Sequence, residues 1–298
     1  MRIFKREIQP QVIRLSLLAL FIIFLIGFKI IAANVLKMKI DKILGSTKEY
    51  VSYADVSMDI FGFDVHIDDI KINFPGQKPL LIDEMIIKSF DDDHALPHYM
   101  NVKFKGIQSD LEMLKMNPKF SKTINDLELK DIRSELILNY KYNKEQKMLD
   151  VQEMVLEVDS LGKISYKTQI HNVVAMEYFL MQLNLAPQTL KFGPTLIQFD
   201  NDSLVERFMK MNAKDNNLSL DRYKADLFSG EQKHVDEERS ASKNVQASFH
   251  ESWLKFLKNP KSFEFKTDPA QPIPLILFGD QKDKEKLFKQ LNIKTTVN

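Results

Sequence analysis

The segment VSMDIFGFDVHIDDIKINF, residues 56–74, alternates apolar and polar side chains almost residue by residue. A period of two is typical of strands that bury one face and expose the other. The alternation changes phase after Ile60 and again at Asp68-Asp69, as it does at a bulge or a tight turn. The segment therefore predicts either one long bent strand with bulges or two to three short strands, closed by Pro75-Gly76.

The same alternation returns along the rest of the chain. It predicts further strands at residues 80–87, 102–106, 136–142, 149–158, 164–170, 189–199, 263–265 and 293–297. The phase shifts once more between Val151 and Met154. Residues 136–170 predict a hairpin that turns at residues 143–147 and, with the strand after it, an antiparallel meander with one apolar and one polar face.

Helical patterns are concentrated after His171, although a short helix is also expected at residues 110–116, stopped by Asn117-Pro118. Residues 173–183 are apolar almost all round, which predicts a buried helix. Ser203 and Glu206 fit a capping box at the start of the next helix. Amphipathic helices are predicted at 220–228, 245–257 and 283–291, with the polar run 230–243 between the first two. The predicted fold class is α+β, with a curved antiparallel β-sheet first and helices packed on it in a C-terminal subregion of about 171–292.

The sequence LSLLALFIIFLIGFKIIAANVL, residues 15–36, holds one charge, Lys29, and is long enough to cross a bilayer. It predicts an N-terminal transmembrane helix that acts as an uncleaved anchor; a cleaved signal peptide, with Ile31-Ala32-Ala33 as its cleavage site, is the alternative. The expected organisation is a basic cytoplasmic tail at 1–14, the anchor at 15–36, a linker at 37–48 and a β-rich extracytoplasmic domain at 49–298. Basic residues flank the anchor almost equally, so this orientation follows the usual layout of a signal anchor.

Composition and motifs exclude several classes of chemistry. The chain has 0 Cys, which excludes disulfides and thiolate metal sites, and its formal net charge of +1 argues against a nucleic-acid binder. His250-Glu251 resembles the start of a zinc-protease helix, but Leu254 stands where the second ligand is needed. Asp91-Asp92-Asp93-His94 and His98 are of metal-ligand types, but Pro97 argues against helical convergence and favours a solvated loop. No catalytic residue, cofactor or metal site is predicted, and we expect a protein that is not an enzyme.

The apolar side of the first strands allows two interpretations. Phe61, Phe63, Val65 and Ile67 share one phase of the alternation. They either form core under the helices of the second half, or leave part of this face open as a groove for acyl chains. Each buried CH₂ group contributes roughly 0.8 kcal/mol, so such a groove can hold a lipid without any polar motif. These four residues are the candidate lipid-contact residues.

The layout resembles the AsmA-like superfamily of Gram-negative envelope proteins. The resemblance rests on the N-terminal anchor, on YVSYADVSMDIFGFDVHIDDIKINF followed by LLIDEMIIKSF, and on the later LILNYKY and LEVDSLGKISYKTQIHNV. It implies a bacterial inner-membrane protein with its C-terminal domain in the periplasm, membrane lipid as a partner, and a role in lipid binding, lipid transport or envelope maintenance. The alternative is a membrane-anchored interaction or assembly module with a fully covered sheet, which recruits an envelope protein through an edge strand or through residues 173–183.

Overall fold

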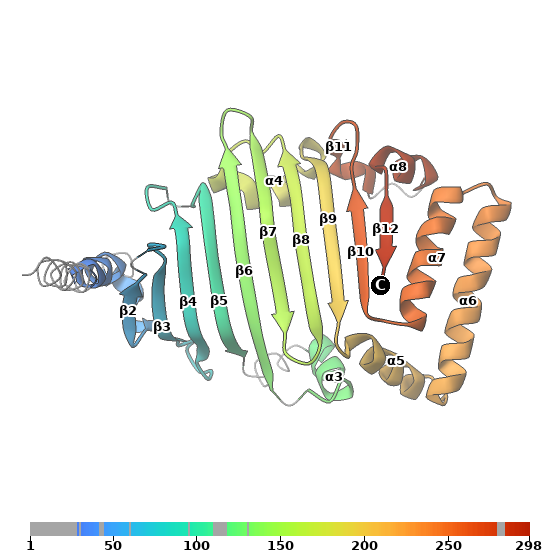
Figure 1. Ribbon diagram of the computed structural model, residues 1–298, viewed down its shortest axis with the longest axis horizontal. Helices are drawn as coiled ribbons and strands as arrows, with labels where there is room; N and C mark the ends of the chain where they lie inside the picture. The colour runs from blue at the N-terminus through green and yellow to red at the C-terminus, as the bar shows by residue number, and fades with distance from the viewer. Residues whose placement is uncertain are drawn as a thin grey trace, which may run out of the picture.

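A computed structural model of the protein describes residues 29, 31–41, 45–59, 61–94, 96–109, 118–129, 131–278 and 284–298. In this part of the chain, 12 strands form one antiparallel sheet. The strand order is β1-β3-β4-β5-β6-β7-β8-β9-β10-β12, with β2 also paired to β3 and β11 to β9. The sheet therefore runs in chain order from the blue N-terminal edge to the red C-terminal edge of Figure 1.

The strands have the following bounds: β1 (Val51–Ser52), β2 (Asp55–Met58), β3 (Val65–Ile72), β4 (Leu80–Phe90), β5 (Tyr99–Ser109), β6 (Ile132–Asn143), β7 (Met148–Val158), β8 (Gly162–His171), β9 (Lys191–Asn201), β10 (Ser262–Thr267), β11 (Ile273–Pro274) and β12 (Lys294–Val297). The predicted antiparallel meander is confirmed, including the hairpin of β6 and β7. The predicted phase shift between Val151 and Met154 is also confirmed, because the register of β7 against β8 shifts between these two residues.

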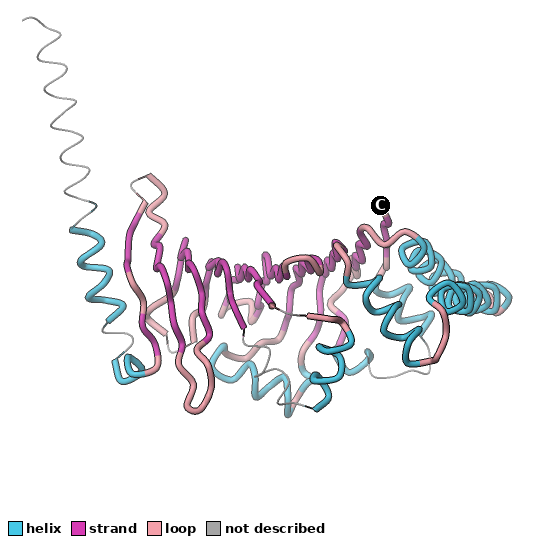
Figure 2. The backbone as a smooth tube through the Cα atoms, turned by 90° about the horizontal axis from the view of Figure 1, so that it is seen from below, coloured by secondary structure: helices cyan, strands magenta, loops and turns pink. Residues whose placement is uncertain are grey.

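The helices lie on one side of the sheet or at its ends. Residues 31–41 are helical, and the later helices are α3 (Pro118–Asp126), α4 (Phe179–Leu185), α5 (Leu204–Asp215), α6 (Leu220–Ser240), α7 (Asn244–Lys258) and α8 (Lys284–Leu291), with short 3-10 turns η1 (Gly45–Glu49), η2 (Met176–Tyr178), η3 (Pro187–Thr189) and η4 (Leu275–Phe278). Figure 2 shows the central strands nearly end on, with helices below them and at the right-hand end. Above the central strands no described helix lies over the sheet. The predicted α+β class is confirmed.

The opening segment forms two short strands, as one of its two interpretations predicted. Strands β2 and β3 pair through Met58 and Val65 at the turn end. Residues 59–64 form the turn, in which Asp59 N–H donates to the Asp64 carbonyl over 2.9 Å. Phe63 has a φ of 56°, which breaks the strand alternation at this point.

Two predictions about helices in the second half need correction. Helix α6 continues through residues 230–240, which were predicted as a polar separator, because this run is rich in good helix formers and buries Val235 at 1% exposure. The capping box is wrong: the Asn201 side chain, not that of Ser203, accepts from Val205 N–H over 2.9 Å and donates to Glu206 over 2.9 Å. Within the subregion 171–292, β9 and β10 confirm the strands predicted at 189–199 and 263–265.

Three predicted segments lie wholly or largely outside the described residues. The tail at 1–14 and the anchor up to residue 28 are among them, as is the helix expected at 110–116; Pro118 begins helix α3. Among the described helices, none combines the length and the apolar character needed to cross a membrane. Residues 37–41, expected as linker, belong to the helix 31–41, which packs on the sheet through Leu36 and Ile40.

Candidate functional site

The structure does not bring the four candidate lipid-contact residues onto one face. Phe61 and Phe63 lie in the turn of the β2–β3 hairpin and are 88% and 61% exposed. Val65 and Ile67 lie on β3 in a core cluster that includes Leu36 of the helix 31–41. Core packing is therefore the correct interpretation for Val65 and Ile67, but the covering helix is N-terminal rather than C-terminal.

A broader apolar surface emerges from the strand register. Residues paired across an antiparallel sheet lie on the same face, so a chain of pairs traces one line across it. The first line is Ile67, Met85, Phe104, Leu136, Leu156, Ile164, Phe199, Phe263 and Val297. The second, two residues along the strands, is Val65, Ile87, Val102, Leu138, Met154, Tyr166, Ile197, Phe265 and Thr295. One face of the sheet is thus apolar from β3 to β12, apart from Thr295.

Helices cover the two ends of this apolar face. At the N-terminal end, the helix 31–41 packs there through Leu36 and Ile40. At the C-terminal end, Phe256 of α7 is 0% exposed and contacts the rings of Phe199 and Phe263, at centroid distances of 5.9 and 5.6 Å. These contacts form the aromatic part of the core.

The middle of the apolar face is left open. Met154, Leu156 and Ile164 are 40%, 41% and 45% exposed, although they belong to long central strands. We call these three residues, with Leu136 and Leu138 beside them, the central apolar face. The sequence placed all five in strands, but no pattern in the sequence could show which part of the face the helices leave uncovered.

The opposite face of the same strands is polar. One line of pairs there is Glu135, Glu157, Lys163 and Asp200. Lys103 of β5 forms an ion pair with Glu135 at 2.6 Å on this side. This face also carries the apolar pair Ile137 and Val155, but Val155 is only 5% exposed. The exposed apolar residues Met154, Leu156 and Ile164 all lie on the other face.

A hollow of about 260 Å³ adjoins the central apolar face where helix α4 crosses β6 and β7. Its lining is almost entirely apolar and includes Leu138 and Met154 from the sheet and Met176, Phe179 and Leu180 from the η2–α4 segment. The volume lies at or below the lower end of the range of small-molecule pockets. It can hold part of an acyl chain, and the open central apolar face lies beside it.

The prediction that residues 173–183 form a buried helix is wrong. Only one side of the short η2–α4 segment packs, through Met176 and Phe179, against the cluster of Tyr142 and Leu149. The other side is exposed, with Val174 at 61%, Tyr178 at 57%, Leu180 at 66%, Met181 at 54% and Leu185 at 75%. An all-round apolar pattern indicated burial, but this helix lies at the periphery and has only one packed side.

A buried amide holds this segment in place. The Gln182 side chain accepts from Val174 N–H over 3.1 Å and donates to the Asn172 carbonyl over 2.8 Å and to Thr189 Oγ1 over 2.9 Å. Gln182 is 8% exposed, so these bonds replace lost water contacts. The two ends of the segment 172–189 are thereby tied to each other, and the apolar residues of α4 are presented in a fixed position.

The aspartate and histidine residues considered for metal binding do come together. Possible ligand atoms of Asp91, His94 and His98 all lie within 4.8 Å of one another. The Asp91 carboxylate, which is buried, accepts from His98 N–H at 2.7 Å and from Asp93 N–H at 3.1 Å, and lies 2.8 Å from His94 Nδ1. These hydrogen bonds, first of all that from His98 N–H, hold the pKa of Asp91 below its ordinary value, although burial opposes them.

The ring geometry of this loop favours a structural role. The rings of His94 and His98 stack with centroids 3.7 Å apart and an angle of 19° between planes. In stacked rings the nitrogen lone pairs point side by side instead of toward one point. The Asp91 carboxylate meanwhile is engaged in closing the loop. The arrangement is that of a hydrogen-bonded loop between β4 and β5, with more order than the solvated loop predicted from the sequence.

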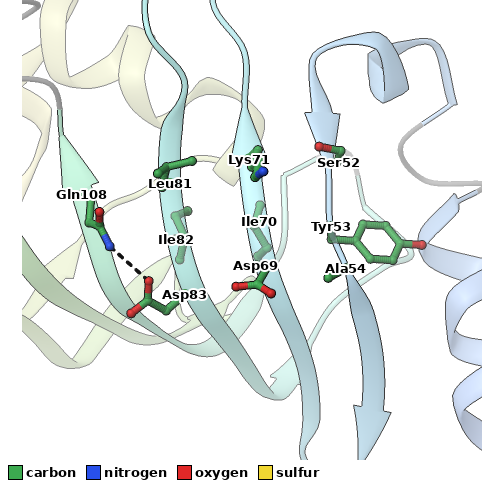
Figure 3. A pocket seen from close by; sticks show the side chains of 10 residues that line it. All are labelled: Ser52, Tyr53, Ala54, Asp69, Ile70, Lys71, Leu81, Ile82, Asp83 and Gln108. Carbon is green, nitrogen blue, oxygen red and sulfur yellow. Dashed lines mark hydrogen bonds between the residues drawn. The ribbon is translucent and has the colours of Figure 1, made fainter.

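A second hollow, of about 420 Å³, lies at the N-terminal end of the sheet between β1, β3, β4 and β5 (Figure 3). Gln108 Nε2 donates to the Asp83 carboxylate over 3.3 Å, and Arg133 forms an ion pair with the same carboxylate. Tyr53 points toward the helix 31–41 and donates to Asp41 over 2.7 Å. These polar groups are used in contacts between elements, so the hollow is a junction of strands and helix.

Comparison with known proteins adds one match. A family model described as an uncharacterised protein matches residues 155–298. The matched segment begins within β7 and includes Leu156, Ile164, the η2–α4 segment and all the later strands and helices. A search of curated proteins finds no match.

Proposed function

We propose that the protein is a single-pass, membrane-anchored envelope protein that binds an acyl chain of a membrane lipid on its central apolar face, without catalysing a reaction. The observation that carries this proposal is the exposure of Met154, Leu156 and Ile164 at the centre of an otherwise covered apolar face. An apolar ligand lying there removes this surface from water. The hollow beneath α4 gives such a ligand a place for one end.

The magnitude of apolar burial supports this chemistry. Burial of a CH₂ group contributes roughly 0.8 kcal/mol, so about five groups contribute roughly 4 kcal/mol before the cost of ordering the chain. Hydrogen-bond donors are not needed for that affinity. The absence of a catalytic signature in the sequence fits a protein whose ligand is recognised by its hydrocarbon.

The setting follows from the sequence. The apolar run 15–36 supplies the transmembrane anchor up to the point where its last turn, with Leu36, packs on the sheet. The β-rich remainder is the periplasmic domain of a bacterial inner-membrane protein. A long antiparallel sheet with one apolar face also supports kinship with the AsmA-like superfamily. If the protein is related to that superfamily, its role is to bind or transport lipid and so to maintain the envelope.

Photocrosslinking from within the full-length protein tests the proposal. Benzoylphenylalanine at Leu156 or Ile164, irradiated in intact membranes, is expected to give lipid adducts that mass spectrometry detects on the purified protein. Glu157 is the matched control, since it is the neighbour of Leu156 but faces the polar side. Adducts of equal yield at Glu157, or none at Leu156 and Ile164, would contradict acyl-chain binding.

A second function is favoured by the exposed side of the η2–α4 segment. Leu180 and Leu185 are 66% and 75% exposed on a segment that Gln182 holds in place. Such a surface suits an interaction or assembly module that binds an envelope protein. The same crosslinker at Leu180 distinguishes the two functions: a discrete protein adduct there, with no lipid adduct at Leu156, supports the interaction module.

A further inference from the structure

The β2–β3 hairpin presents two large aromatic side chains to solvent. Phe61 is 88% exposed and Phe63 is 61% exposed. They flank Gly62 in the turn, and Phe63 N–H donates to the Asp59 carbonyl over 3.2 Å. Phe63 adopts a φ of 56°, a conformation that a bulky residue rarely takes in a turn. Both side chains thus remain largely in contact with solvent.

The helix 31–41 is apolar on two sides. Leu36 and Ile40 pack into the N-terminal core cluster. Ile31, Val35 and Met38 are 66%, 53% and 65% exposed, and their spacing of four and three residues places them on one outward face. A helix at a protein–water boundary normally turns a polar face outward. This one turns a second apolar face outward.

These two features lie at the same end of the structure. Asp41, at the end of the helix, accepts a hydrogen bond from Tyr53, which lies beside the middle of β3. Lys39 forms an ion pair with Asp92, which follows β4. That end of β4 pairs with the end of β3 nearest the hairpin turn. The helix therefore runs from the turn end of the hairpin toward the middle of the sheet. Figure 2 shows the hairpin turn at the upper left, beside the upper end of this helix.

The sequence that precedes the helix 31–41 indicates that a membrane covers the end of the domain where the β2–β3 turn lies. Residues 15–28 read LSLLALFIIFLIGF and lead directly into the outward stripe of Ile31 and Val35. In the proposed function this run is inserted in the bilayer, which brings the hydrocarbon boundary to the end of the domain where Phe61 and Phe63 project. Aromatic side chains are favoured at that boundary.

We infer that the hairpin residues Phe61 and Phe63, together with the outward face of the helix 31–41, lie in the interface of the membrane that holds the anchor. The inference rests on the proposed anchoring but not on acyl-chain binding by the central apolar face. The β2–β3 hairpin and the helix 31–41 then both contact the bilayer, and these two contacts fix the orientation of the domain.

Single cysteines in the full-length protein test this inference, and the 0 Cys background makes each one unique. A polarity-sensitive fluorophore at Phe61→Cys or Phe63→Cys is expected to emit at shorter wavelength in phosphatidylglycerol–phosphatidylcholine vesicles and to be quenched by lipids that carry a nitroxide near the headgroup. Gln77→Cys is the matched control, because the exposed β3–β4 turn lies at the opposite end of β3. This label is expected to report water.

Each outcome has a separate meaning. Quenching at positions 61 and 63 but not at 77 supports the inference. Equal, water-like emission at all three positions on protein that floats with the vesicles overturns it and leaves the anchor intact. Protein that does not float with the vesicles overturns both the anchor and the seating of the hairpin. Because Phe61 and Phe63 are exposed, their replacement is not expected to unfold the domain, and an unchanged urea midpoint confirms that the labelled variants are folded.

Discussion

At the scale of single residues, the backbone conformation around a glycine determines whether the fold requires that glycine. Gly162 begins β8 with a φ of 144°, and a Cβ added there would lie 2.4 Å from the backbone carbonyl oxygen of Asp200. Gly230 lies inside α6 with open space around the same position. The two glycines are equally inconspicuous in the sequence, but only the first is required by the fold.

Alanine substitutions should therefore shift stability in opposite directions at these two sites. Gly162→Ala is expected to lower the free energy of unfolding by about 1–3 kcal/mol, because the methyl group strains backbone that cannot move away. Gly230→Ala is expected to raise it by up to about 1 kcal/mol, since alanine is the better helix former. Urea denaturation of both variants measures the difference, and shifts of the same sign would show that the close approach at Gly162 is relieved cheaply.

A histidine beside the hairpin gives the protein a pH-dependent contact. His66 Nδ1 lies 2.7 Å from Glu84, and Nε2 lies 3.2 Å from Asp59. Burial alone would lower the pKa of His66, but the hydrogen bond to Glu84 and the nearby Asp59 carboxylate outweigh it, and the pKa is raised. The protonated form is thus the one that stabilises the folded state.

The contribution of His66 should be lost as pH rises. Because its folded pKa is raised, the contribution is complete below the ordinary value of about 6.5 and disappears as pH passes through the folded pKa. Urea unfolding at pH 5.5 and pH 8.5 is expected to show a larger loss of stability for His66→Gln at the lower pH, within about 1 kcal/mol for a partly exposed pair. An equal loss at both pH values would mean that the charge of His66 contributes nothing.

At the scale of elements, the alternation of apolar and polar residues predicted the strands well. It did not predict which parts of the sheet the helices cover. Hairpins, bulges and strand pairing depend on neighbours in sequence, so β6 to β8 could be predicted from their own residues. Whether an apolar side is buried depends on partners far away in the chain. For that reason the exposure of α4 was missed, as was the helix 31–41 that covers Val65 and Ile67. The choice of Asn201 over Ser203 as the cap is a similar competition between neighbouring acceptors.

The buried amide of Gln182 is the signal in the sequence that α4 is not an ordinary core helix. Gln182→Leu keeps the size of the side chain but leaves Val174 N–H without its acceptor. We expect a loss of about 1–3 kcal/mol in stability and faster chymotrypsin cleavage near Tyr178 and Phe179. Met181→Leu, at an exposed neighbouring position, should change neither property. Unchanged cleavage of Gln182→Leu would show that packing of Met176 and Phe179 alone holds the segment.

At the scale of the whole molecule, one sheet carries two unlike surfaces. The polar side has no described helix over its central strands, whereas helices cover both ends of the apolar side and part of its centre, where Met154, Leu156 and Ile164 stay exposed. The sequence predicted a sheet with two such faces. It placed the candidate lipid-contact residues on the β2–β3 hairpin, whereas the exposed apolar residues Met154, Leu156 and Ile164 lie on β7 and β8. Part of β6, β7 and β8 is open because the η2–α4 segment covers these strands only near Tyr142 and Leu149.

The strand order has a consequence for how the molecule is made. From β3 to β9 each strand pairs with the strand that was synthesised just before it. The sheet can therefore grow one hairpin at a time from its N-terminal edge while the rest of the chain is still emerging, without waiting for distant segments. Among the later strands, β11 and β12 depart from this rule, because β11 pairs with β9 and β12 pairs with β10. Strand β10 follows the rule, but α5, α6 and α7 must be synthesised before it can pair with β9. Closure of that last junction, which also brings Phe256 over Phe199, is the step expected to complete the fold.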